Sequence, residues 1–150
     1  MQVRQLHDHA GQRTFAVVLD TGDEAMSCLR SFAKAHGVTA AQVTAIGAFS
    51  DAELYFFDWE TKAYEAIPVN EQVEVAALTG DIAVDAESQP VLHLHVVLGR
   101  RDGTAIAGHL NAAHVRPTLE VTVTETPGHL HRVHDPETGL ALIRINGGPK

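Results

Sequence analysis

Cysteine and basic residues are scarce in this 150-residue chain, and each shortage excludes a class of protein. Cys28 is the only cysteine, so no disulfide can form within the chain, and we expect a reducing, cytoplasmic location. Eleven Lys and Arg residues stand against nineteen Asp and Glu, and the formal net charge is −8. Because phosphate backbones are bound by clustered basic side chains, this balance argues against direct DNA or RNA binding.

Long apolar runs and the common nucleotide and protease motifs are also missing. No stretch approaches the roughly 18 apolar residues that a membrane span needs, and the first thirteen residues carry no apolar run typical of a secretory signal. The sequence contains no glycine-rich phosphate loop, no G-x-S-x-G elbow and no H-E-x-x-H helix. These absences leave one domain of ordinary size over residues 1–150, with a core over about 13–145 and a polar tail over 146–150.

Histidine, in contrast, is abundant, and three of the ten histidines fall in one predicted β-hairpin, Val91–Leu110. His93 and His95 are two residues apart, so in a strand they point to the same side. A loop at Arg101–Gly103, with Gly103 in a left-handed conformation, places His95 opposite His109. A register shifted by one residue would turn His109 into the apolar face, which burial disfavours.

Three converging imidazoles match the ligand set of a catalytic-type zinc site that keeps a fourth position open. Copper, nickel and iron also accept imidazole, so the residues alone leave the metal undetermined. The alternative is that these are three unrelated strand histidines. The other two H-x-H pairs, His7/His9 and His129/His131, have no positioned third partner, and we interpret them as surface residues.

Further site candidates depend on how the strands are arranged. Glu120 lies on the polar face of the predicted strand Thr118–Glu125. If that strand neighbours the hairpin, Glu120 could complete the ligand sphere, orient a ligating histidine or act as a general base; otherwise it is an ordinary exposed glutamate. Thr79 and Gly80 interrupt an apolar strand, which suggests the close approach of a ligand, a bulge or another subunit. Ser50 could line a pocket, and Arg101 could hold a carboxylate.

The periodicity predicts an α+β domain, a largely antiparallel sheet or sandwich with one packed helix. A capping-box pattern at Thr21–Glu24 precedes the predicted helix, Asp23 to about His36, and Gly37 is expected to end it. A second capping-box pattern at Thr39–Gln42 predicts a further helical turn. The remaining apolar runs predict strands over residues 14–19, 43–49, 52–57, 63–67, 73–84, 91–98, 104–110, 118–125 and 140–145.

Four stretches resemble the PPC domain, a family conserved between plants and prokaryotes. They are IGAFSDAEL at 46–54, VEVAALTG at 73–80, the hairpin HLHVVLGRRDGTAIAGHL and LEV at 119–121. The resemblance, over Arg13 to Ile145, implies a sandwich-like subunit that forms a homotrimer and holds zinc through His93, His95 and His109. The family's DNA-binding label comes from plant members with a basic AT-hook arm, and neither end of this sequence shows such an arm.

Two functions from different classes follow from the residues and the resemblance together. The first is a zinc-dependent decarboxylase or hydrolase acting on a small oxo- or hydroxy-acid, with Glu120 moving the proton. The second is a non-enzymatic module that senses a metabolite or associates with DNA through a basic partner. An open metal position favours the first and a closed one favours a structural role.

Overall fold

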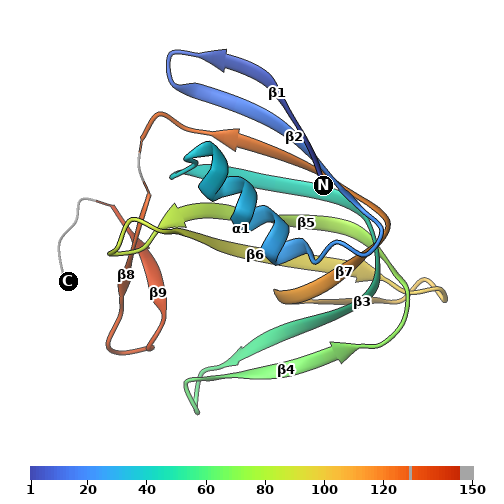
Figure 1. Cartoon of the computed structure of the whole chain (residues 1–150). Helices are drawn as coiled ribbons and strands as arrows, with labels where there is room; N and C mark the ends of the chain where they lie inside the picture. Colours follow the sequence, from blue (N-terminus) through green and yellow to red (C-terminus); the bar gives the residue numbers. More distant parts are fainter. Residues whose placement is uncertain (129, 146–150) are drawn as a thin grey trace.

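The structure is a computed structural model that describes residues 1–128 and 130–145; His129 and the predicted polar tail, 146–150, lie outside them. The described residues form one nine-stranded sheet and one helix, so the fold is mostly β rather than the expected α+β (Figure 1). The elements are β1 (Gln2–His9), β2 (Gln12–Asp20), α1 (Ala25–His36), β3 (Ala41–Asp58), β4 (Ala63–Val69), β5 (Val73–Val84), β6 (Pro90–Gly99), β7 (Ala105–Glu125), β8 (His131–His134) and β9 (Ala141–Arg144).

The sheet closes on itself around its four long strands. β7 pairs with β3 along nearly its whole length, β3 pairs with β5, β5 with β6, and β6 returns to the first residues of β7. Apolar side chains alternate along these strands and point inward, as period-2 patterning requires. The ring therefore encloses a core whose fully buried members include Phe49, Leu54, Leu94, Leu98 and Leu110.

The helix α1 lies across one face of the sheet and buries Leu29, Phe32 and Ala33 against it (Figure 1). Gly37 ends it in the left-handed conformation with φ of 62°, as predicted. The helix begins differently from the prediction. Its N-cap is Glu24, whose carboxylate accepts hydrogen bonds from the backbone N–H groups of Met26 and Ser27, so the expected capping box at Thr21 does not form.

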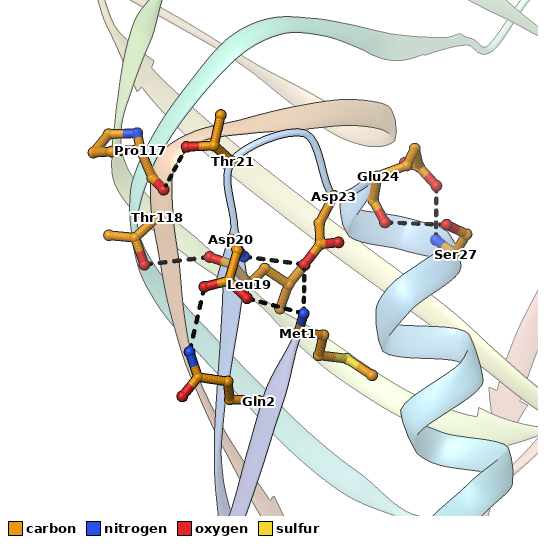
Figure 2. Close-up of polar contacts among 10 residues, drawn as sticks. All are labelled: Met1, Gln2, Leu19, Asp20, Thr21, Asp23, Glu24, Ser27, Pro117 and Thr118. Carbon is orange, nitrogen blue, oxygen red and sulfur yellow. Dashed lines mark hydrogen bonds and ion pairs between the residues drawn. The ribbon is translucent and has the colours of Figure 1, made fainter.

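The first strand, β1, was not predicted, because all eight of its residues are exposed and its sequence is polar. It pairs with β2 at the edge of the sheet. Its start is fixed by the terminal ammonium group of Met1, which lies 3.1 Å from an Asp20 carboxylate oxygen and 2.9 Å from one of Asp23 (Figure 2). Figure 2 also shows Thr21 donating to the Pro117 carbonyl at 3.1 Å, which joins this corner to β7.

Two other expectations about the strands were wrong. The predicted helical turn at Thr39–Gln42 does not form; β3 begins at Ala41, which pairs with both Ile82 and Glu125. The separate strands predicted at 43–49 and 52–57 are one strand, and those at 104–110 and 118–125 are also one. None of the described helices is long and apolar enough to cross a membrane.

Candidate metal centre

The register of the β6–β7 hairpin is the one predicted from the apolar pattern. His95 pairs with His109, and Leu98 pairs with Ile106. The Arg100 N–H donates to the Thr104 carbonyl at 2.8 Å, and Gly103 takes the left-handed conformation with φ of 85°. The loop and the buried apolar residues therefore agree on one pairing, and that pairing sets three histidines on the outer face of the ring.

The ring nitrogens of His93, His95 and His109 converge. One potential ligand atom from each lies within 4.8 Å of the other two. His93 Nε2 and His95 Nε2 are 3.2 Å apart. Around a tetrahedral zinc ion with Zn–N bonds of about 2.0–2.1 Å, ligand nitrogens stand roughly 3.3 Å apart. Small rotations of the imidazole rings would therefore complete a three-histidine site.

The surroundings of His93 and His109 favour neutral imidazole, the form that binds metals. Burial lowers the pKa of His109 to about 4, and positive charge on His93 and His95 adds to this effect. Burial also lowers the pKa of His93, followed by the charge of Arg132. His109 Nδ1 is buried and has no hydrogen-bond partner among the described residues. An unpaired ring nitrogen costs free energy unless it is bound, so this atom fits a site made for a ligand.

Behind His93 lies an ion pair that sequence reasoning missed. Arg132 of β8 donates from Nη2 to Asp81 Oδ1 of β5 at 2.6 Å. Asp81 Oδ2 is 4.0 Å from His93 Nδ1. A carboxylate that accepts a hydrogen bond from the second nitrogen of a metal-ligating histidine sets the ring's tautomer and orientation, and Asp81 is the carboxylate within 4.0 Å of that nitrogen of His93. The signal available in the sequence was the acidic residue that directly follows Gly80.

Two cavities flank His109. The first cavity, of about 430 Å³, is lined by His95 and His109 and by the aromatic side chains of Tyr55, Phe57 and Tyr64. The Tyr64 ring lies 5.4 Å from the His109 ring, centroid to centroid. The second cavity, of about 290 Å³, is bordered by the β8–β9 hairpin and reaches His93 and His109. The centre is thus accessible from two sides.

Glu120 is not brought to the histidines within one chain. It pairs with Val18 of β2 and Ile46 of β3, so β3 and β5 separate its position from β6. It lines a separate hollow of about 350 Å³, together with Thr79. The proposed role of Glu120 as a base required its strand segment to lie beside the histidines of the hairpin. Within one subunit it does not.

The four predicted pocket residues are dispersed. Thr79 pairs with His95 and is the one that lies beside the site. Gly80 is opposed by the backbone of β6: a Cβ atom there would overlap the His93 carbonyl oxygen. Gly80 therefore allows the backbone of β6 to approach closely, and no ligand is needed to explain the glycine. Ser50 Oγ donates to Asp51 at 2.8 Å, away from the hairpin, and Arg101 is exposed in the β6–β7 loop.

Among the described residues, only His93, His95 and His109 converge in a cluster that could hold a metal ion. His7 and His9 are exposed on β1, with ring centroids 6.4 Å apart. His131 is exposed on β8, and His129 lies outside the described residues. His114, on β7, donates a hydrogen bond from Nδ1 to Asp51 Oδ1 at 2.8 Å, which raises the pKa of the imidazole.

Comparisons with known proteins agree with this fold. A metal-containing protein from Archaeoglobus fulgidus is 34% identical, with a TM-score of 0.82 over 88% of this chain and 93% of that one. A protein from Bacteroides thetaiotaomicron, provisionally described as DNA-binding, is 30% identical, with a TM-score of 0.83 over 95% and 96%. A plant- and prokaryote-conserved (PPC) protein from Pyrococcus horikoshii is 25% identical, with a TM-score of 0.82 over 96% and 95%.

A search of the curated proteins found no match. The family model named Plants and Prokaryotes Conserved (PCC) domain matches residues 7–127 of this sequence. That span holds the three converging histidines and most of the strands that position them. The chain belongs to the Plants and Prokaryotes Conserved domain family.

Proposed function

We propose that the chain binds one divalent transition-metal ion, zinc, through His93, His95 and His109. The observation that carries the proposal is the convergence of their ring nitrogens to within 4.8 Å of one another on a hairpin of fixed register. Three neutral nitrogen ligands with a fourth position open is the arrangement of catalytic zinc sites. The metal-containing relative from Archaeoglobus fulgidus, 34% identical, supports the same assignment.

The chemistry we propose is decarboxylation or hydrolysis of a small oxo- or hydroxy-acid. Zinc, when bound, supplies a Lewis acid that polarises a carbonyl group or lowers the pKa of water. Asp81 would hold the His93 ring in its ligating orientation. The aromatic side chains of Tyr55, Phe57 and Tyr64 would shield one side of the site from solvent.

A homotrimer is part of the proposal. The side chains of Ile46 and Val97 are 60% and 39% exposed on the outer face of the sheet. Exposed apolar side chains that line neighbouring hollows are typical of a surface covered by another subunit. Glu120 lines the same hollow as Ile46, so it enters the chemistry only if an adjacent subunit brings it to the histidines. Sedimentation equilibrium should give a mass of about three times 16.1 kDa.

The reaction is tested by a panel of small oxo- and hydroxy-acids, followed by carbon dioxide release and by product analysis. We expect turnover by zinc-loaded protein, loss on chelation and recovery on adding zinc. The variant His95→Ala should be inactive, and His9→Ala, a matched change in the exposed H-x-H pair, should keep full activity. Equal turnover by the chelated and zinc-loaded proteins would refute a metal-dependent reaction.

A second candidate is a regulatory or DNA-associated module located, like the enzyme, in the cytoplasm. The relative from Bacteroides thetaiotaomicron, provisionally described as DNA-binding, favours it, whereas the net charge of −8 opposes direct contact with phosphates. Retention on duplex DNA that falls steeply between about 50 and 200 mM salt is its signature. Retention with that salt dependence, and no turnover of any acid, would favour the second candidate.

A further inference from the structure

The side chain of Arg132 is buried, but its hydrogen-bond partners do not satisfy all of its N–H groups. Only 6% of it is exposed. Nη2 donates to Asp81 at 2.6 Å, and Nη1 donates to the Ala141 carbonyl at 3.0 Å. The Nε atom, equally shielded from water, has no partner among the described residues. A buried N–H of a charged group that is left unsatisfied costs a large part of its desolvation energy, so an acceptor that reached Nε would stabilise this side chain.

Arg132 also borders the cavity of about 290 Å³ that reaches the metal centre. His93 and His109 line the same cavity, so one small molecule could meet the guanidinium and the centre together. The rest of the lining is largely apolar, contributed by residues such as Leu92, Leu140 and Leu142. An apolar pocket with a few convergent polar groups is the usual form of a small-molecule site, and this volume is at the small end of the range.

The charges of the site favour an anion. The charges of Arg132 and Asp81 balance one another. The three imidazoles are neutral when they bind a metal, so they would leave the charge of a divalent ion uncompensated. A carboxylate matches both the free N–H of Arg132 and the positive charge of the metal ion. One of its oxygens can accept a hydrogen bond from the guanidinium group, while its negative charge offsets that of the metal. The sequence pointed to Arg101 for this role, but Arg101 lies in an exposed loop.

We infer that Arg132 and the three histidines form a subsite for the carboxylate group of a small organic acid, with Arg132 Nε as the donor that recognises it. The inference rests on the proposed metal site and names the class of ligand that the site takes. Its competitor is a purely structural role, in which Arg132 only anchors the β8–β9 hairpin to β5 through Asp81 and Ala141.

The test titrates zinc-loaded protein with pyruvate by isothermal titration calorimetry and uses pyruvamide as the neutral analogue. Arg132→Met removes the donor and the charge. Asp81→Asn breaks the same ion pair but keeps the cation. Arg30→Met, on the exposed side of α1, is the matched control for loss of one arginine. Zinc content and circular dichroism are measured first for each protein, so that folding and metal binding are known before ligand affinity is compared.

We expect pyruvate to bind the wild type more tightly than pyruvamide, and Arg132→Met to weaken pyruvate binding by about tenfold or more while keeping its zinc. Arg30→Met should bind pyruvate as tightly as the wild type, whereas Asp81→Asn, which also removes the carboxylate beside His93, should lose affinity for pyruvate and pyruvamide alike. Equal weakening of pyruvate and pyruvamide binding by Arg132→Met would overturn the subsite in favour of the structural role. No pyruvate binding by zinc-loaded wild type would also overturn it. A wild type without zinc would instead overturn the proposed metal site itself.

Discussion

Replacing Gly80 with alanine tests how the packing of two strands supports the proposed metal centre. A Cβ at this position would overlap the backbone carbonyl oxygen of His93 and lie 2.9 Å from Leu94 Cα. Neither backbone atom can rotate away, so β5 and β6 must separate by roughly 1 Å or more, which breaks N–H···O bonds of normal length of about 2.9 Å. The separation falls between the positions of His93 and His95, so the variant disturbs two ligands at once.

The expected cost follows from two contributions. Overpacking contributes about 1–3 kcal/mol, and the loss of one or two ladder hydrogen bonds adds about 0.5–1.5 kcal/mol each. The free energy of unfolding should therefore fall by about 1.5–6 kcal/mol, and Tm by on the order of 10 °C for a domain of this size. Zinc affinity should fall as well. Scanning calorimetry and zinc titration measure the two effects.

The control for this prediction is Gly99→Ala in β6. A Cβ there would meet Glu74 Cβ at 3.8 Å, which is ordinary contact. We expect this variant to melt within about 2 °C of the wild type and to keep its zinc affinity. The reasoning would be refuted if Gly80→Ala behaved like Gly99→Ala in both measurements.

Two further predictions concern stability outside the centre. Glu24→Ala removes the N-cap of α1 and an acceptor for the Ala113 N–H, so chemical denaturation should show a loss of about 1–3 kcal/mol; a loss below about 0.3 kcal/mol would contradict it. The His114–Asp51 pair should stabilise the fold only where both groups are charged. The hydrogen bond to Asp51 raises the pKa of His114 above 6.5, so this contribution is complete below pH 6.5 and disappears as pH rises through the higher folded value. The bond to His114 lowers the pKa of Asp51 below 3.8, so the contribution is also lost as pH falls through that lower value. Because both side chains are about half exposed, His114→Gln should cost less than about 1 kcal/mol at pH 5.5 and nothing measurable at pH 9; an equal cost at both pH values would argue against the pair.

The hairpin that carries His93, His95 and His109 could be predicted because all its determinants are local. Alternation of apolar residues, a short loop and Gly103 are read from twenty consecutive residues, and each favours the same register. The helix and its glycine end were predictable for the same reason. At Thr39–Gln42 the local signal was overridden, because Ala40 and Ala41 are buried and Ala41 pairs with strands from two distant parts of the chain.

The surroundings of the centre depend on pairings that no local pattern specifies. Arg132 and Asp81 are 51 residues apart, and they meet because β8 docks beside the end of β5. Tyr64 reaches His109 because β4 pairs with the second half of β3, which in turn pairs with the first half of β7. The strand β1 is exposed and has no apolar face, so its sequence lacks the alternation of apolar and polar residues that predicts a strand.

The central claim, that three histidines of one hairpin bind a metal ion, is tested most directly by elemental mass spectrometry of the purified, untagged protein. The comparison is with His93→Ala/His95→Ala and with His7→Ala/His9→Ala, which removes an H-x-H pair of the same spacing from an exposed strand. We predict about one zinc ion per subunit in the wild type and in the β1 variant, and none in the β6 variant. Full zinc content in the β6 variant, or none in the wild type after growth with zinc, would contradict the assignment.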